Sequence, residues 1–418
     1  MPAVKWNKLV AQERVKDVLG RVFESGALGH AYLFCGERGV GKFAAAVDLA
    51  MAVLCQCKDA AAPRPCGECP SCRRAAAYSH PDLHVIMPLC LSAEHKGGEG
   101  GALSEEGWAL ASASVRARID DPYRLPRYDG IPHIPVEWVR EADHAVMRGA
   151  VEGASGVAII DGVDTMKKES ANALLKTLEE PPPGMLLLLL TERVHSVLPT
   201  ILSRCQTVRF PLLPPEVVGA ELCGRFGIST SLNDRMAAND RITADDSITA
   251  SDRVAAAAAA GSLGLAISEY ENPLDEYYGH AASLWGDCLR GDWGAAAATV
   301  DGLSSGKDSY NVCRNTVSCL IRLIRAAFLR RSLSEVETRS LSEVETRKFG
   351  QGGVSMNYIN PGVSGGLELP AEYGPDELSA VVRLVHGALN GLDARGNALI
   401  VMAGLVCSLM EALNVEKQ

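Results

Sequence analysis

Short runs of hydrophobic residues alternate with helical patterns through the first 210 residues of the chain. We interpret five of these runs as strands that are buried on both faces of a parallel sheet, because such strands are short and apolar. They are AYLFC (31–35), LHVIM (83–87), GVAIID (156–161), MLLLLLT (185–191) and TVRF (207–210). Because helical segments separate them, the pattern predicts βαβ units and a doubly wound α/β domain.

Helical periodicity dominates where the strand pattern stops. Hydrophobic residues recur at helical spacing after Lys42, and SANALLKTLEE (170–180) predicts a helix that ends before three consecutive prolines. Beyond Pro215 no further strand pattern occurs, and segments such as YNVCRNTVSCLIRLIRAAFLRRSL and DELSAVVRLVHGALN predict helices. The expected fold class is therefore an α/β domain followed by all-α regions.

Changes in composition divide the chain into three expected regions. A Gly-rich stretch interrupts the α/β pattern, and we interpret residues 88–132 as a long surface insertion. The octapeptide RSLSEVET occurs twice in tandem at 331–346, which indicates an elongated surface helix or loop, because a repeat fold needs at least three units. The expected domains are residues 1–212, with a cysteine module at 55–72 and the insertion at 88–132, then a small helical domain at 213–271 and a helical domain at 272–418.

Composition and charge narrow the classes of function. The net charge of −10 argues against a protein that coats nucleic acid through a general surplus of Lys and Arg. No run of 18 apolar residues with suitable flanks is present, and Met1–Gly20 is polar and mixed in charge, so we expect neither a membrane span nor a signal peptide. The 13 cysteines are clustered in one place and otherwise scattered, which favours a reducing cytoplasm and a metal site over disulfides.

The stretch GERGVGKF (36–43) resembles a phosphate-binding loop, in which G-x-x-x-x-G-K is followed by Ser or Thr. It stands between a predicted strand and a predicted helix, as such a loop requires. Candidate nucleotide-binding residues are therefore Gly36, Gly39, Gly41 and Lys42, because backbone N–H groups, a helix N-terminus and a lysine all favour phosphate. A chance turn is the alternative. Phe43 replaces the hydroxyl that would bind Mg²⁺.

Asp161 is a further candidate residue of the same pocket. NTPases hold their metal with an Asp at the end of an apolar strand, and GVAIID ends in this way. The next residue is Gly162, which has no side chain that could act as a base. Asp161 could instead be a loop residue that caps the next helix.

Cys66, Cys69 and Cys72 are separated by two residues each, and thiolates at this spacing can surround one tetrahedral ion. Either Cys55 or Cys57, at the end of the preceding helix, would supply the fourth ligand. Four thiolates suit Zn²⁺ in a closed structural site. The alternative, surface cysteines without a metal, fits this spacing less well.

Arg204 follows a short predicted helix and precedes a strand in LPTILSRCQTVRF (198–210). Its guanidinium could cap the C-terminus of that helix or act as a catalytic arginine finger. The residues alone favour the cap, because surface arginines are common.

Several stretches together resemble the clamp-loader family of bacterial DNA polymerase III, most closely its delta-prime subunits. In chain order they are HAYLFCGERGVGK (30–42), CGECPSC (66–72), HPDLHVI (80–86), IPVEWVRE (134–141), ANALLKTLEEPP (171–182), LPTILSRCQ (198–206) and AAGSLGLAI (259–267). The C-terminal region matches the family only in being helical.

This resemblance implies an AAA+ module with a zinc-binding element, a small helical lid (213–271) and a helical collar (272–418) that joins subunits into a ring. It implies gamma/tau and delta subunits as partners, contact with the sliding clamp and primed DNA through the complex, and a cytoplasmic location away from membranes. A neighbouring motor subunit would bind ATP and Mg²⁺. Arg204, in the motif Ser203-Arg204-Cys205, would reach that ATP in trans as an arginine finger.

Three departures from the family's motor subunits agree with one another. Phe43 lacks the Mg²⁺-binding hydroxyl, Gly162 stands where motors have a Glu, and Gly264 stands where the lid of a motor has a nucleotide-sensing Arg. We therefore expect a stator-like subunit with no ATPase activity of its own. The alternatives are an ATP-hydrolysing gamma/tau-like motor subunit and a nucleic-acid-binding zinc protein unrelated to clamp loading.

Overall fold

The computed structural model of this chain describes most of the sequence in two compact units. The described residues are 2–59, 61–92, 94–97, 102–126, 128, 132–226, 261–271, 275–305, 309–324, 375–393 and 396–413. The tandem octapeptide at 331–346 and most of the small helical domain expected at 213–271 lie outside them. The first unit comprises Met1–Leu213 and Ser262–Ile267, and the second comprises Pro214–Gly261 and Ser268–Gln418.

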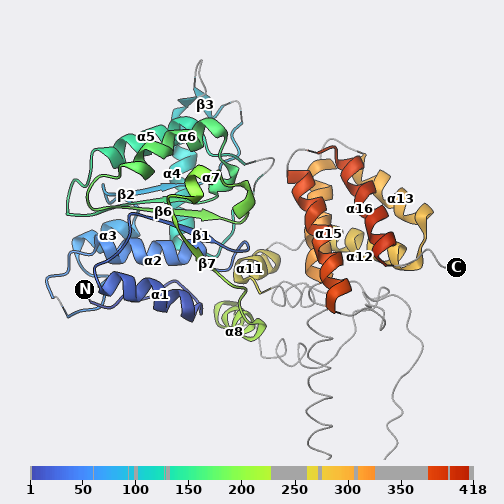
Figure 1. The fold of residues 1–418 in the computed structure, drawn as a ribbon, viewed down its shortest axis with the longest axis horizontal. Coiled ribbons are helices and arrows are strands. Elements are labelled where there is room, and N and C mark those ends of the chain that lie inside the picture. Colours follow the sequence, from blue (N-terminus) through green and yellow to red (C-terminus); the bar gives the residue numbers. More distant parts are fainter. Residues whose placement is uncertain are drawn as a thin grey trace, which may run out of the picture. The chain divides into compact units, whose positions relative to one another are not determined.

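A five-stranded parallel sheet forms the centre of the first unit, as the runs of hydrophobic residues predict (Figure 1). The strand order is β2-β5-β6-β1-β7. The strands are β1 (Ala31–Cys35), β2 (Leu83–Ile86), β5 (Gly156–Ile160), β6 (Met185–Thr191) and β7 (Gln206–Arg209). The inner strands β1, β5 and β6 are buried at every position, because helices cover both faces of the sheet. The predicted α/β fold is therefore confirmed.

Helices cover the two faces of this sheet (Figure 1). One face carries α1 (Glu13–Glu24), α2 (Lys42–Leu54) and α3 (Pro70–Ala76), and the other carries α5 (Val136–Met147) and α6 (Lys168–Glu179). Short helices η1 (Val163–Thr165), η2 (Val194–Ser196) and α7 (Pro199–Leu202) lie in the loops that follow β5 and β6. Because all five strands are parallel, the loops at their carboxyl ends meet at one edge, where α/β proteins bind ligands.

The insertion predicted at 88–132 is more ordered than the sequence suggests. It contains a two-stranded antiparallel hairpin, β3 (Lys96–Gly97) and β4 (Ala102–Leu103), and a 16-residue helix, α4 (Glu105–Asp120). Ser104 caps α4 by accepting a hydrogen bond from the backbone N–H of Gly107. Val115, Ile119 and Tyr123 are buried, so the prediction of a surface segment is wrong for this part. Ala, Ser and charged residues fill most of α4, which weakens the hydrophobic periodicity that would have indicated it.

Every element that the structure describes in the second unit is a helix. Its helices are α8 (Pro215–Phe226), the end of α11 (Leu263–Glu271), α12 (Asp275–Arg290), α13 (Trp293–Ser304), a helix at 309–324, α15 (Pro375–Asp393) and α16 (Ala398–Ala412). A shared core includes Trp285, Leu320, Val385 and Leu405. Within the described residues, no helix is long and apolar enough to cross a bilayer.

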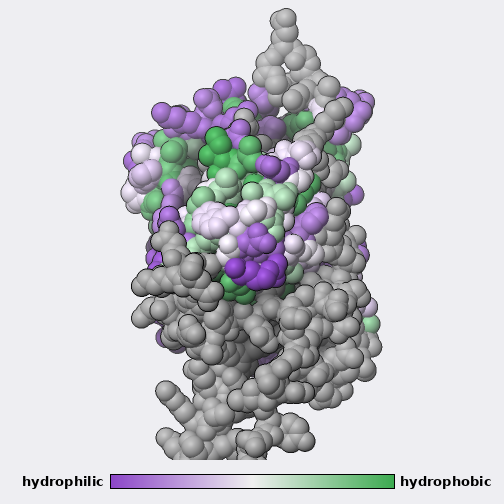
Figure 2. Space-filling model, turned by 90° about the vertical axis from the view of Figure 1, so that its right-hand side faces the viewer, coloured by the Kyte–Doolittle hydropathy of each residue, from purple (hydrophilic) through white to green (hydrophobic). Residues whose placement is uncertain are grey.

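Buried charge and exposed hydrophobic side chains both occur in the second unit. Arg322 forms an ion pair with Glu269, and both side chains are almost inaccessible to solvent. The large hydrophobic residues Trp293, Leu399 and Ile400 are exposed. On the face of the molecule drawn in Figure 2, hydrophobic and hydrophilic residues lie side by side. Single exposed hydrophobic residues are normal for protein surfaces and do not by themselves define a binding site.

Candidate functional site

The phosphate-loop turn lies between the carboxyl end of β1 and the start of α2, as predicted. Gly39 and Gly41 have positive φ angles of +77° and +108°, which disfavour other residues. A Cβ atom at Gly39 would also lie 2.4 Å from Ser262 Oγ, and one at Gly41 would lie 2.7 Å from Tyr123 Oη. The two glycines are thus required by the backbone conformation and by close packing, whether or not the loop binds phosphate.

Lys42 points back into its own loop. Its Nζ donates hydrogen bonds to the backbone carbonyls of Gly36 and Glu37, each 2.7 Å away. The side chain is only 7% exposed, and this burial lowers the pKa of the amine. Two of its three donors are therefore used by the protein in this conformation.

Phe43, in the position of the missing hydroxyl, is fully buried beneath an arginine from the insertion. The guanidinium carbon of Arg118, in the last turn of α4, lies 4.8 Å from the centroid of the Phe43 ring. Arg118 Nε also lies 3.6 Å from a carboxylate oxygen of Asp161, the residue that follows β5. The structure thus brings Phe43 and Asp161 together, but around a residue that the sequence analysis did not select.

The chain that follows α4 packs against the same loop. The hydroxyl of Tyr123 accepts a hydrogen bond from the backbone N–H of Val10 at 3.0 Å. Arg38, within the phosphate loop, donates to the carbonyl of Pro126 at 2.7 Å. Burial raises the pKa of Tyr128, and the nearby Asp161 carboxylate contributes to the same shift. Residues of the insertion therefore lie around the phosphate loop and Asp161, where nucleotide-binding groups were expected.

Gly264, the position of the sensing arginine in motor subunits, is also enclosed. Its backbone N–H donates to Gly39 O at 3.0 Å. A Cβ atom here would lie 2.9 Å from the carbonyl oxygen of Tyr123 and 3.1 Å from Leu125. A side chain as long as arginine would displace these residues, because contacts under about 3 Å are repulsive.

Gly162 has a structural requirement of its own. Its φ angle is +71°, and a Cβ atom would lie 2.8 Å from Cγ of Pro88. The backbone that would present a water-activating glutamate is thus left-handed and faces a proline ring. The absence of the glutamate is built into the local fold.

We predict that Gly162→Glu will not create ATPase activity and will destabilise the protein by about 2–3 kcal/mol, through left-handed strain and the contact with Pro88. Gly149→Glu is the matched control, because Gly149 also has a positive φ (+78°) but nothing lies within 4 Å of its Cβ position. The control should lose only about 1 kcal/mol. Chemical denaturation measures both, and equal losses would contradict the role of the Pro88 contact.

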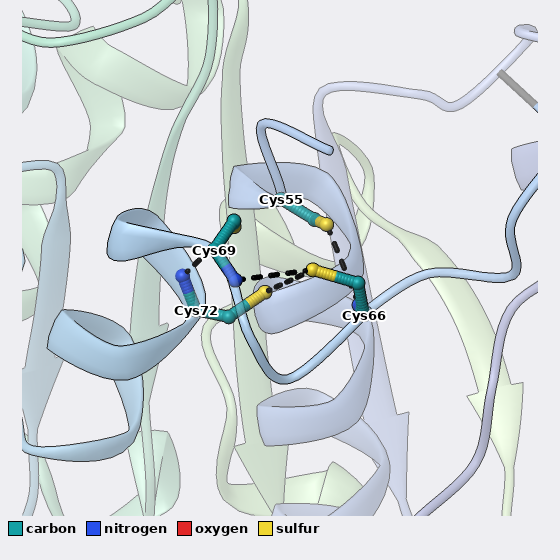
Figure 3. Close-up of side chains that lie close together, drawn as sticks. All are labelled: Cys55, Cys66, Cys69 and Cys72. Carbon is teal, nitrogen blue, oxygen red and sulfur yellow. Dashed lines mark hydrogen bonds between the residues drawn. The ribbon is translucent and has the colours of Figure 1, made fainter. Parts of the chain in front are cut away.

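Four cysteines gather at the amino end of α3 (Figure 3). The sulfur atoms of Cys55, Cys66, Cys69 and Cys72 all lie within 4.8 Å of one another. Cys57 is not part of this group, so the structure brings Cys55 rather than Cys57 to the three others. Cys55 directly follows α2, where the chain turns into an extended conformation, and Cys69 is the N-cap of α3.

This cysteine cluster fits a tetrahedral metal ion. Thiolates bound to Zn²⁺ at about 2.3 Å lie about 3.8 Å apart, and the Sγ atoms of Cys66 and Cys72 are separated by 3.9 Å. Backbone N–H groups donate to the sulfurs of Cys55, Cys66 and Cys69. The N–H groups of Cys69 and Glu68 lower the pKa of Cys66 to about 6, whereas burial raises the pKa of Cys55 and Cys72. A bound cation would stabilise the two buried thiolates.

The motif HPDLH attaches the cysteine cluster to the sheet. Ser71, next to Cys72, hydrogen-bonds with Nε2 of His80 at 2.9 Å and donates to the carbonyl of Leu54. The backbone N–H of Asp82 donates to Nδ1 of the same histidine. The Asp82 carboxylate accepts hydrogen bonds from the backbone of Val151 and Glu152, before β5. These contacts link α2, α3 and the sheet around the cluster.

Arg204 lies just after α7 with 33% of its side chain exposed. It donates hydrogen bonds to the carbonyl of Thr200 at 2.9 Å and to the carboxylate of Glu179 at 2.6 Å. The first contact is the helix-capping geometry that the sequence allows. The second fixes the direction of the guanidinium, and Glu179 comes from the segment ANALLKTLEEPP at the end of α6.

The parallel sheet and the turn after β1 define the first unit as an α/β module built on a phosphate-loop turn. A family model described as DNA polymerase III, delta subunit, matches residues 11–214. That part of the chain is therefore similar to the DNA polymerase III subunits that this family model describes.

Individual relatives point to the same family. The chain is 30% identical over 217 residues to DNA polymerase III subunit delta' of Bacillus subtilis, covering 52% of this chain and 53% of the relative. It is 34% identical over 183 residues to the delta' subunit of Pseudomonas aeruginosa, covering 44% and 43%. It is 29% identical over 224 residues to subunit gamma/tau of Mycobacterium bovis, covering 53% and 32%. The chain thus spans about half the length of the delta' relatives.

One solved structure is that of a DNA polymerase III, gamma subunit-related protein from Thermotoga maritima. The alignment covers 96% of this chain and 99% of the Thermotoga chain. The sequence identity is 12% and the TM-score is 0.35. The assignment of the fold rests on the parallel sheet of the chain itself.

Proposed function

We propose that the chain is a delta-prime-like stator subunit of the DNA polymerase III clamp loader, one that helps to place the sliding clamp on primed DNA without hydrolysing ATP itself. The observation that carries the proposal is the arrangement around Phe43. The position that would supply a hydroxyl to Mg²⁺ is an aromatic ring covered by Arg118, and the residue after Asp161 is a glycine that faces Pro88. Neither a metal-binding hydroxyl nor a water-activating carboxylate stands at these two positions.

Arg204 is proposed to act in trans, as an arginine finger at the ATP site of a neighbouring gamma/tau subunit. Its partial exposure supports this role, because the guanidinium can reach a group outside the chain. The hydrogen bonds to Glu179 and Thr200 support it as well, since they hold a long side chain in one direction before any partner binds. In this proposal Arg204 both caps α7, through the carbonyl of Thr200, and acts as the arginine finger.

The cysteine cluster is proposed to hold a structural Zn²⁺ ion. The four sulfurs leave no open coordination position for a substrate, which is typical of structural rather than catalytic zinc. The helical second unit is proposed to be the collar that contacts gamma/tau and delta subunits. Its exposed Trp293, Leu399 and Ile400 are available for such contacts.

The proposed function predicts two results for purified proteins. The isolated chain should show no Mg²⁺-dependent ATP turnover above background, and it should copurify with gamma/tau and delta subunits when all are coexpressed. Coupled-enzyme assays and size-exclusion chromatography measure these outcomes. Robust turnover by the lone chain would contradict the stator role, and failure to associate with the other subunits would contradict the clamp-loader role.

The second candidate, an ATP-hydrolysing motor subunit, is favoured by the similarity to gamma/tau relatives at 29% identity. Phe43, Gly162 and Gly264 oppose it. Phe43 lacks the hydroxyl that a motor would need, and the packing around the two glycines leaves no room for a longer side chain. The turnover assay on the lone chain separates the two candidates.

A further inference from the structure

We infer that the insertion closes the nucleotide pocket of this chain from within, and that the Arg118 guanidinium occupies the place of the metal ion. The residues involved all lie within the first unit, so this closure needs no other subunit. It gives the insertion a function, whereas its sequence suggests only a surface location.

The position of Arg118 is the first argument. In phosphate-loop NTPases, Mg²⁺ is held between the Ser or Thr after the loop lysine and the Asp at the end of a neighbouring strand. The corresponding residues here are Phe43 and Asp161, and Arg118 contacts both. A guanidinium is a permanent cation that can stack on an aromatic ring and pair with a carboxylate at the same time. The ring of Phe43 therefore provides a stacking partner for Arg118, in addition to removing the hydroxyl that would bind Mg²⁺.

The way in which Arg118 is held is the second argument. Its Nη1 atom donates hydrogen bonds to the carbonyls of Pro122 and Arg124, in the turn after α4. Lys8 donates to the carbonyl of Ile119 at 2.8 Å and so ties the end of α4 to the N-terminal segment. Three independent contacts therefore fix this turn and the side chain that emerges from it.

The path of the following residues is the third argument. Tyr123 packs on Gly41, Leu125 packs on Gly264, and Arg38 holds the carbonyl of Pro126. The contacted residues belong to the phosphate loop or to the lid position that senses nucleotide in motor subunits. A bound nucleoside triphosphate would have to displace the segment 118–126 together with the hydrogen bonds of Arg38 and Lys42.

Thermal denaturation of the full chain with nucleotide tests whether the pocket is closed. With 1 mM MgATP or MgADP we expect the melting temperature to change by less than about 1 °C, because ligand that does not bind the folded state does not stabilise it. A saturable increase of about 2 °C or more with either nucleotide would overturn the inference.

Substitution of Arg118 tests the resident cation. Arg118→Ala should lower the melting temperature by roughly 5–10 °C, because it leaves Asp161 and Phe43 without their partner. Arg116→Ala is the matched control, since Arg116 is an exposed residue of the same helix, and it should change the melting temperature by less than about 1 °C. Equal effects of the two substitutions would overturn the inference.

If Arg118→Ala is poorly folded, a double-mutant cycle with milder substitutions can still test whether Arg118 and Phe43 interact. Arg118→Lys and Phe43→Leu each preserve part of the contact, and their combination should lower the melting temperature by less than the sum of the single effects, because both remove the same stacking interaction. Strictly additive effects would show that the two residues do not act as a pair, which would overturn the assignment of Arg118.

Discussion

Arg204→Ala is expected to lower ATP turnover by about 10³-fold or more at the ATP site that the proposed finger would reach in a reconstituted clamp loader. Arginine fingers supplied by a neighbouring subunit contribute 10³–10⁵ in rate in NTPases, because a planar guanidinium stabilises charge that develops on the transferred phosphate. The measurement is steady-state ATP hydrolysis by complexes that contain either form of the chain, in the presence of the clamp and primed DNA. The total rate of ATP hydrolysis by the complex should fall by the fraction that this one site contributes to it.

The stability of the lone chain separates the finger from a simple helix cap. The Arg204–Glu179 ion pair lies at the surface, so its loss should cost less than about 1 kcal/mol in the free energy of unfolding. A residue that only caps α7 would show this small loss and leave turnover unchanged. Arg204→Lys keeps the charge but not the fork of donors, so its complex should also assemble normally but should not reach full turnover. Normal turnover in an intact Arg204→Ala complex would contradict the proposed role.

Most of the sheet could be predicted from the sequence because parallel strands that are buried on both faces are apolar at consecutive positions. β6 is the clearest case, since all seven residues of Met185–Thr191 are buried. The edge strand β7 is the exception, since its residues are exposed or half-buried and the expected burial on both faces is wrong for it. The phosphate-loop turn was also predictable, because its glycines and lysine occur between such a strand and a helix. These features depend on residues that are close together in the chain.

The closed pocket could not be predicted because it depends on a contact between distant segments. Arg118 belongs to a helix whose sequence is rich in Ala and charged residues, and Phe43 belongs to the phosphate loop. No local pattern links an arginine at the end of one helix to a ring at the start of another. The only sequence feature that pointed to this contact was Phe43 itself, an aromatic residue in a place that normally holds a hydroxyl.

The choice between Cys55 and Cys57 was likewise beyond the sequence, because both follow the end of α2. In the structure, the chain turns after Leu54 so that Cys55 lies with the other three cysteines and Cys57 does not. Cys55 is buried beside Cys66 and Cys72, whereas the carbonyl of Cys57 accepts a hydrogen bond from Arg64. The side chain of Arg64 also donates to the carbonyl of Cys55 and so fixes this turn.

The cysteine cluster and the insertion both hold loops of the first unit in place. A subunit that does not cycle between nucleotide states, as proposed for this chain, would need such interactions to hold its loops. In this chain the insertion holds the phosphate loop, and the cysteine cluster with His80 and Asp82 holds the region between α2 and β5. A rigid subunit that presents Arg204 in a constant orientation would be the outcome, which is consistent with the proposed stator role.

The largest effect on stability is expected from removal of the proposed zinc ion through Cys69→Ser. Serine is a favourable N-cap, so the variant keeps the hydrogen bond from the N–H of Cys72 that caps α3 and loses only the thiolate. When the free metal concentration is at least about 1,000 times the dissociation constant, metal binding stabilises the folded state by about 4 kcal/mol. For a domain of this size, each kcal/mol corresponds to about 2–4 °C in melting temperature. We therefore expect a decrease of about 8–16 °C together with the loss of bound zinc, measured by calorimetry and by metal analysis.

Cys57→Ser is the matched control for this prediction, because Cys57 is a neighbouring cysteine outside the cluster, and it should leave zinc content and melting temperature unchanged. Treatment of the unmodified chain with a strong chelator should reproduce the effect of Cys69→Ser, because both remove the same ion. The chelator should have no further effect on the variant, which separates loss of metal from loss of packing. A Cys69→Ser protein that melts like the unmodified chain and still binds one equivalent of zinc would show that the thiolate of Cys69 is not a ligand.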